Sequence, residues 1–254
     1  MARTVSEAAV TISPAGLIVV VLVVFVAYLV FGVTGFGASP ITIPVLVQLL
    51  PLPFVLSLAA LLDLSSALVL GFHTRREADT RELMILVPFT LAGLVLGVTL
   101  LVRLPNRATL LALGLFVCGY AIYVIARRDT VRRLSRRWAA LAGLVGGVVG
   151  ALFGIGGPPY VMYIAGRVPD PAAQRATIAQ MVILNVGLRV GAFALAGFLA
   201  SRALWTAVAL LLPVAWLGLW AGHHAHMRAA PATTARVIGA ALLLTGLTLI
   251  VRAF

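Results

Sequence analysis

Apolar residues fill most of the chain in long runs, and short polar segments separate the runs. A helix needs about 20 apolar residues to cross about 30 Å of hydrocarbon, at a rise of about 1.5 Å per residue. Eight runs are long enough, or nearly so, and we predict spanning helices at residues 14–35, 53–72, 83–102, 108–126, 138–153, 176–198, 203–221 and 237–251. Two further apolar stretches, 41–50 and 160–165, are too short to cross alone, so we predict re-entrant or half helices there.

A glycine- and proline-rich break precedes each short stretch. The two breaks are Gly35-Phe36-Gly37-Ala38-Ser39-Pro40 and Gly154-Ile155-Gly156-Gly157-Pro158-Pro159, and they begin 119 residues apart. Such segments interrupt a helix and leave backbone groups that lipid cannot pair. Broken segments in matching positions of two halves are typical of the binding site of a secondary transporter. We predict that the two breaks face one another near the membrane midplane.

Other landmarks recur in the same order in the second half. Pro88, Gly93 and Gly97 return as Pro213, Gly218 and Gly222, which gives one Pro-x4-Gly-x3-Gly pattern twice. We interpret the paired glycines as points of close helix packing. The domain organisation that follows is a cytoplasmic N-terminal segment at 1–13, a first transmembrane repeat of four helices at 14–126, an arginine-rich cytoplasmic linker at 127–137 and a second repeat of four helices at 138–254.

Composition excludes most other classes of protein. The chain is 62% apolar and only 10% charged, against about 25% charged residues in soluble domains. It has no Gly-x-x-x-x-Gly-Lys phosphate loop, and Cys118 is its single cysteine. The net charge of +12 comes from arginines in short loops beside apolar runs, where basic residues set orientation. We therefore expect the bilayer as partner and no nucleic acid, metal or cofactor, and homo-oligomerisation stays open.

The arginines also predict how the chain is oriented. The linker holds six of the 19, so we place it in the cytoplasm. With four crossings in each half, both termini are cytoplasmic and Arg167 and Arg175 lie on the outer side. Five crossings in each half, with inverted repeats, would fit the charges as well. Helix length favours four.

Two ionisable residues, Asp63 and Arg189, lie near the middle of predicted spans. A charge there is costly unless it is paired or hydrated, so each is a functional candidate. The two spans are equivalent in the repeats, and the side chains could meet. Arg189 could hold the anion and Asp63 could carry the coupling proton, or the pair could be a structural bridge only.

Uncharged polar groups add to this candidate site. Asn185 shares a helix face with Met181 and Arg189 at a spacing of four residues. Glycine-rich turns that lead into short helices offer backbone N–H groups and a positive dipole end, which suit an oxyanion. We expect substrate contacts from Gly35, Gly37, Ser39, Pro40, Gly154, Gly156, Gly157, Pro158, Asn185 and Arg189. Secondary candidates are Ser66, Gln180, Tyr160 and Tyr163, and for the tyrosines packing is an equal alternative.

The run Gly150-Ala151-Leu152-Phe153-Gly154-Ile155-Gly156-Gly157-Pro158 resembles the signature of the sulfite exporter TauE/SafE family of membrane permeases. The likeness extends over nearly the whole chain. The first half departs from it at Thr34 and at Ala38-Ser39-Pro40, where members commonly carry more glycine. The resemblance implies a secondary transporter in the bacterial inner membrane that exports sulfite or an organosulfonate. Coupling to the proton gradient by alternating access is our leading hypothesis.

Two other function classes remain as alternatives. A passive anion channel could be lined by the same donors. An enzyme acting on lipid would need clustered acids or histidines, and Asp63 is the single acidic residue within the predicted spans.

Overall fold

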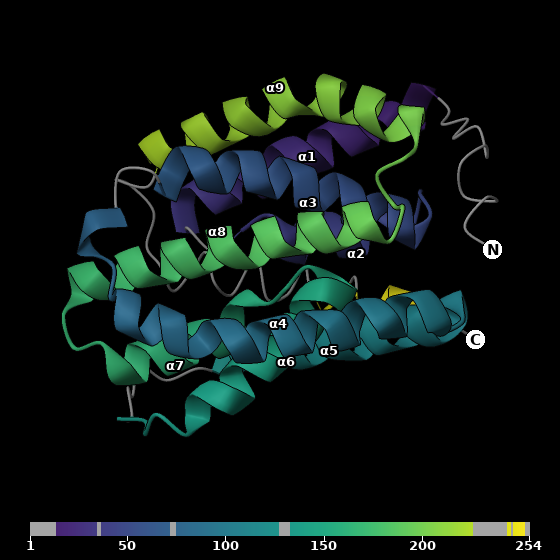
Figure 1. Ribbon diagram of the computed structural model, residues 1–254. Helices are drawn as coiled ribbons and strands as arrows, with labels where there is room; N and C mark the ends of the chain where they lie inside the picture. Colours follow the sequence, from purple (N-terminus) through teal and green to yellow (C-terminus); the bar gives the residue numbers. More distant parts are fainter. Residues whose placement is uncertain are drawn as a thin grey trace. The chain divides into compact units, whose positions relative to one another are not determined.

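Helices make up every regular element in the part of the chain that the structure describes, which is residues 14–34, 37–71, 75–126, 133–225, 243–244 and 246–251 of a computed structural model (Figure 1). The elements are α1 (Pro14–Thr34), α2 (Ser39–Leu46), α3 (Leu52–Gly71), η1 (Arg75–Glu77), α4 (Thr80–Arg103), α5 (Asn106–Ala126), α6 (Trp138–Phe153), α7 (Gly157–Arg167), α8 (Pro171–Leu195) and α9 (Arg202–Ala225).

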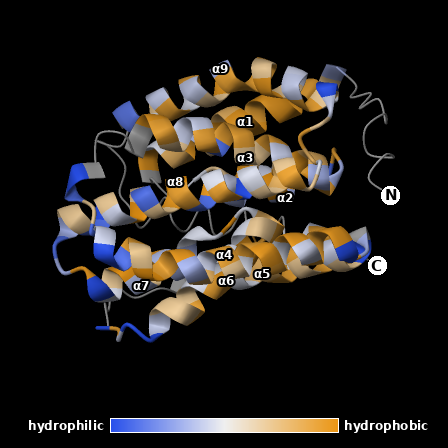
Figure 2. Cartoon of the chain, viewed as in Figure 1, coloured by the Kyte–Doolittle hydropathy of each residue, from blue (hydrophilic) through white to orange (hydrophobic). Residues whose placement is uncertain are grey.

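Five of these helices are long and apolar enough to cross a membrane: α1, α3, α4, α8 and α9. Helices α5 and α6 are apolar but have shorter apolar segments. In Figure 2 hydrophobic residues run along the helices, and hydrophilic residues gather mostly near their ends. The prediction of an all-helical integral membrane protein is confirmed at this level. The eight-span, two-repeat organisation stays a prediction, and nearly half of the eighth span lies outside the described residues.

Short helices follow both glycine/proline breaks. Helix α2 has 8 residues and α7 has 11, which correspond to about 12 Å and about 16 Å of helix. Neither can cross the hydrocarbon alone, as the sequence predicted.

The chain folds into two compact units, and each takes segments from both halves of the sequence. Unit 1 contains residues 1–62, 104–128 and 197–254, and unit 2 contains residues 63–103 and 129–196. The boundary falls inside α3, between Leu62 and Asp63. Unit 1 therefore holds α1, α2, α5 and α9, whereas unit 2 holds α4, α6, α7 and α8.

Glycine contacts join the main helix pair of each unit. In unit 1, α1 packs along α9, and a Cβ on Gly218 would lie 2.5 Å from the carbonyl oxygen of Phe25. In unit 2, α4 packs along α6, and a Cβ on Gly97 would lie 2.8 Å from the carbonyl oxygen of Val148. Each pair joins a helix from one half of the sequence to a helix from the other (Figure 1). The packing role predicted for the Gly-x3-Gly pairs is thus confirmed.

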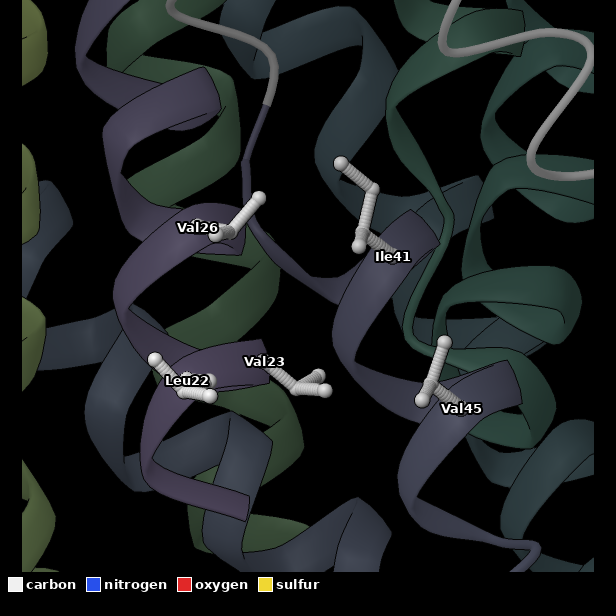
Figure 3. Close-up of a pocket in the computed structure, with 5 residues that line it drawn as sticks. All are labelled: Leu22, Val23, Val26, Ile41 and Val45. Atoms are coloured by element: carbon white, nitrogen blue, oxygen red, sulfur yellow. The ribbon is translucent and has the colours of Figure 1, made fainter. Parts of the chain in front are cut away.

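An apolar groove lies between α1 and α2 in unit 1, and Figure 3 shows five of the side chains that line it. They are Leu22, Val23 and Val26 from α1 and Ile41 and Val45 from α2. All five are aliphatic and offer no hydrogen-bond donor to an anion. The groove does not suit a charged substrate.

The close helix contacts predict which glycines cannot be replaced by alanine without a loss of stability. We expect Gly97→Ala and Gly222→Ala each to destabilise the protein by about 1–3 kcal/mol, because the new Cβ would press on the backbone of the partner helix. Thermal unfolding of the purified protein in detergent measures the effect. Gly119→Ala in α5 is the matched control, since its Cβ would meet nothing within 4 Å. Equal unfolding temperatures for Gly222→Ala and Gly119→Ala would contradict the prediction.

Candidate functional site

The second glycine/proline break turns the chain from α6 into α7. Helix α6 ends at Phe153, and Gly154 follows in the left-handed region with φ +70°. Its N–H donates to the carbonyl oxygen of Gly150 over 3.0 Å. Residues without a Cβ take this conformation at little cost. Gly156 then precedes the first turn of α7, in which Pro158 and Pro159 carry no N–H group.

Asn185 of α8 packs directly against this break. A Cβ on Gly150 would lie 2.9 Å from the Asn185 amide nitrogen, and one on Gly156 would lie 2.6 Å from it. The same amide nitrogen donates to the Tyr160 hydroxyl over 3.1 Å. The glycines therefore provide the space that Asn185 occupies, and α7 contributes its hydrogen-bond partner.

Arg189 lies one turn further along α8 and is 1% exposed. One terminal nitrogen donates to Asp63 of α3 over 3.4 Å, and the other donates to the Gly150 carbonyl oxygen over 3.3 Å. The last carbonyls of a helix carry partial negative charge, so the C-terminal end of α6 stabilises the guanidinium. The predicted contact between Asp63 and Arg189 is confirmed, while the roles assigned to the two residues stay predictions.

The helix face predicted for α8 is also confirmed, because Met181, Asn185 and Arg189 are all buried. Gln180 is half-buried and lies off this face. Ser66 of α3 is fully buried. Unit 2 thus brings together the second break, Asn185, Arg189, Asp63 and Tyr160. Among the described residues no group of three His, Cys, Asp or Glu side chains could hold a metal ion.

The first break belongs to unit 1 and is described in part. Gly35 lies outside the described residues. Gly37 has φ +90°, and α2 begins with the buried Ser39 followed by Pro40. The Thr42 hydroxyl donates to the Ala38 carbonyl oxygen over 3.0 Å. A substrate-binding role for this break, and its position opposite the second one, stay predictions.

The sequence analysis missed a second polar cluster in unit 2, centred on Glu82 at the start of α4. Glu82 is 3% exposed. One carboxylate oxygen accepts from Arg136 over 3.3 Å and from Arg167 over 3.0 Å, and the other accepts from the Tyr163 hydroxyl. No sequence pattern marks this cluster, because its four residues are separated by up to 85 positions. Tyr163 therefore donates to a carboxylate in this cluster, away from Arg189.

The Glu82 cluster corrects one part of the predicted orientation. Arg136 belongs to the linker and Arg167 to the end of α7, yet both bind the same oxygen atom. The Leu134 N–H also donates to the Gly166 carbonyl oxygen over 3.0 Å. The start of α6 and the end of α7 thus lie at one end of unit 2, so the prediction that Arg167 and the linker lie on opposite sides is wrong. Helix α7 therefore returns the chain to the end of unit 2 at which α6 begins, and the number of crossings in each half stays a prediction.

Comparisons with known proteins agree with one another. The family model described as "Sulfite exporter TauE/SafE" matches residues 20–249. A curated relative from Comamonas testosteroni, "Probable inner membrane transporter protein TsaS", is 24% identical over 194 residues, which cover 76% of this chain and 81% of the relative. No solved structure matches the chain.

Removal of the Glu82 carboxylate should destabilise unit 2. We expect Glu82→Gln to lower the free energy of unfolding by about 1–3 kcal/mol, because the buried Tyr163 hydroxyl and two partly exposed arginines lose a charged acceptor. Arg167→Gln should cost more than Arg136→Gln, since Arg167 makes two bonds to the carboxylate and one to the Leu134 carbonyl oxygen. Thermal unfolding in detergent measures this order. Equal stability of the two arginine variants would argue against it.

Proposed function

The chain belongs to the sulfite exporter TauE/SafE family of membrane transporters, and we propose that it exports a small sulfur-containing oxyanion such as sulfite or an organosulfonate. The observation that carries the proposal is Arg189, a cation buried in a membrane helix beside a glycine-rich break. A buried guanidinium at such a place is a binding group for an anion unless its pairing is purely structural. We propose a transporter rather than an enzyme.

The groups around Arg189 suit an oxyanion. A guanidinium stays charged at any physiological pH and can bind two oxygens through parallel N–H bonds. The start of α7 adds the positive end of a helix dipole and the backbone N–H groups of Gly156 and Gly157. A Cβ on Gly157 would meet nothing within 4 Å, so this part of the break is open to a ligand. Asn185 offers an amide one turn from Arg189.

Asp63 links binding of the anion to a proton. In the structure its carboxylate is bound to Arg189, so an arriving anion competes with it for the guanidinium. A carboxylate in a low-dielectric site can take up a proton near neutral pH. Protonation removes the competitor, and anion and proton then bind together. Alternating access around this site would convert the linkage into coupled transport.

We further propose the bacterial inner membrane as the location, with the linker in the cytoplasm. The Glu82 cluster places the start of α4, the start of α6 and the end of α7 on the side of the linker. Arg133, Arg136 and Arg137 then face the leaflet in which positive charge is favoured.

Substitution of the ion pair tests the coupling mechanism. Arg189→Gln should abolish binding of sulfite at every pH, because the counter-charge is lost. Asp63→Asn should retain binding but lose its pH dependence and its response to an imposed proton gradient. Titration calorimetry on purified protein and sulfite flux in proteoliposomes measure the two effects. Arg175→Gln is the matched control, since this arginine in the first turn of α8 is exposed.

Two outcomes would contradict the mechanism. If Asp63→Asn and Arg189→Gln each misfold while the double variant folds and transports normally, the pair is a structural bridge only. If wild-type flux ignores an imposed pH gradient and does not saturate with sulfite, the protein is a passive channel.

Gly157 offers a test of the open part of the break. We expect Gly157→Leu to fold normally and to bind sulfite at least tenfold more weakly, because its side chain would occupy the space beside the α7 N-terminus. Gly156→Leu is less informative, since a Cβ there would already lie 2.6 Å from the carbonyl oxygen of Gly146. Gly191→Leu in α8 is the control, because its Cβ also meets nothing within 4 Å. Unchanged affinity in Gly157→Leu would remove the break from the binding site.

A further inference from the structure

Serine and threonine hydroxyls on helices commonly donate to the carbonyl oxygen four residues earlier, which satisfies them in a medium without water. At least six hydroxyls in the described part of the chain follow this rule. The hydroxyls of Thr42, Ser57, Thr99, Thr109, Thr177 and Thr206 each donate to that carbonyl oxygen over 2.6–3.4 Å.

Ser66 and Thr90 depart from the rule. Both side chains are fully buried. Within the described part of the chain the Ser66 hydroxyl has no hydrogen-bond partner, and the Thr90 hydroxyl has only a weak contact with the Tyr160 hydroxyl. Each is on a helix, yet neither hydroxyl donates to the carbonyl oxygen four residues earlier. A buried hydroxyl without a partner is unfavourable and calls for an explanation, such as an absent ligand.

The two hydroxyls lie around the same site in unit 2. Ser66 follows Asp63 by three residues on α3 and so shares its helix face. This part of α3 lies against α8, because a Cβ on Gly187 would be 3.9 Å from the Leu64 side chain. Ser66 is therefore on the Arg189 side of the site.

Thr90 is on the Asn185 side. Its side chain interacts with the Tyr160 hydroxyl, which accepts from Asn185. The close packing of α4 on α6 fixes the position of Thr90, since a Cβ on Gly143 of α6 would lie 3.2 Å from the Thr90 backbone nitrogen. Asn185 and Arg189 are one helical turn apart, which is about 5–6 Å between their Cβ atoms. A small anion can span this distance.

We propose that the hydroxyls of Ser66 and Thr90 donate hydrogen bonds to the oxygens of the bound anion. This inference rests on the proposed function and specifies the class of substrate. Arg189 can bind two oxygens of a flat carboxylate or of a sulfur oxyanion equally well. A carboxylate bound in this way offers further donors only the remaining lone pairs of the same two oxygens, whereas sulfite and sulfonates present a third oxygen outside the guanidinium plane. The hydroxyls therefore favour sulfite and sulfonates over carboxylates.

Binding of sulfite, methanesulfonate and acetate to the purified protein in detergent tests the proposal. We expect Ser66→Ala and Thr90→Val each to raise the Kd for sulfite and methanesulfonate about tenfold, the effect of one lost hydrogen bond to a charged group. Acetate should bind wild type more weakly than sulfite, and its Kd should rise less than that of sulfite in both variants. Without any anion, the unfolding temperature of each variant should equal or exceed that of wild type, because an unpaired buried hydroxyl has been removed.

Two control variants carry the same chemical change at hydroxyls that are already paired. Ser57→Ala and Thr109→Val should bind sulfite with the wild-type Kd. If wild type binds neither sulfite nor methanesulfonate, the proposed function is wrong. If wild type binds them but Ser66→Ala and Thr90→Val keep its affinity, only the present inference fails. If only one of Ser66→Ala and Thr90→Val raises the Kd for sulfite, the assignment of the other hydroxyl is wrong. If a variant unfolds at a lower temperature than wild type without anion, that hydroxyl has a structural role and the inference fails for it.

Discussion

A guanidinium buried in a membrane helix must have acceptors around it, and unit 2 is organised to supply them to Arg189. Water cannot reach a group that is 1% exposed, so the partners are the Asp63 carboxylate and the Gly150 carbonyl oxygen. That oxygen also accepts from the Gly154 N–H in the last turn of α6, so Arg189 adds a second hydrogen bond to a carbonyl at the C-terminal end of the helix. The break and the buried charge thus share one backbone acceptor.

Helix α7 connects this site to the second polar cluster. Tyr160 accepts a hydrogen bond from Asn185, and Tyr163, three residues later, donates to Glu82. Both tyrosines are almost fully buried on one short helix. A displacement of α7 that altered one contact would strain the other. In the proposed alternating-access cycle, α7 would connect occupancy of the Arg189 site with the end of unit 2 that carries the linker arginines.

Much of the candidate site follows from the sequence, for identifiable reasons. Asp63 and Arg189 stand out because charge is rare inside apolar runs, and the spacing of four residues places Asn185 beside Arg189. The Glu82 cluster could not be found in this way. Its members lie in polar segments, where arginines and acids are common and nothing marks the pairs that meet. The prediction that Arg167 lies on the side opposite the linker was wrong for the same reason. Counting charges does not reveal that α7 returns to the linker.

By itself the sequence determined the membrane class, the limits of most helices, the two breaks and the glycines at which helices pack. These are local properties, fixed by the length of apolar runs, by the missing Cβ of glycine and by the missing N–H of proline. Only the tertiary structure decided that α1 pairs with α9 and α4 with α6, and that Asn185 fills the space left by Gly150 and Gly156. It also decided that the Ser66 hydroxyl has no hydrogen-bond partner among the described residues. Such contacts join residues far apart in the chain, and they depend on which surfaces meet once the helices have formed.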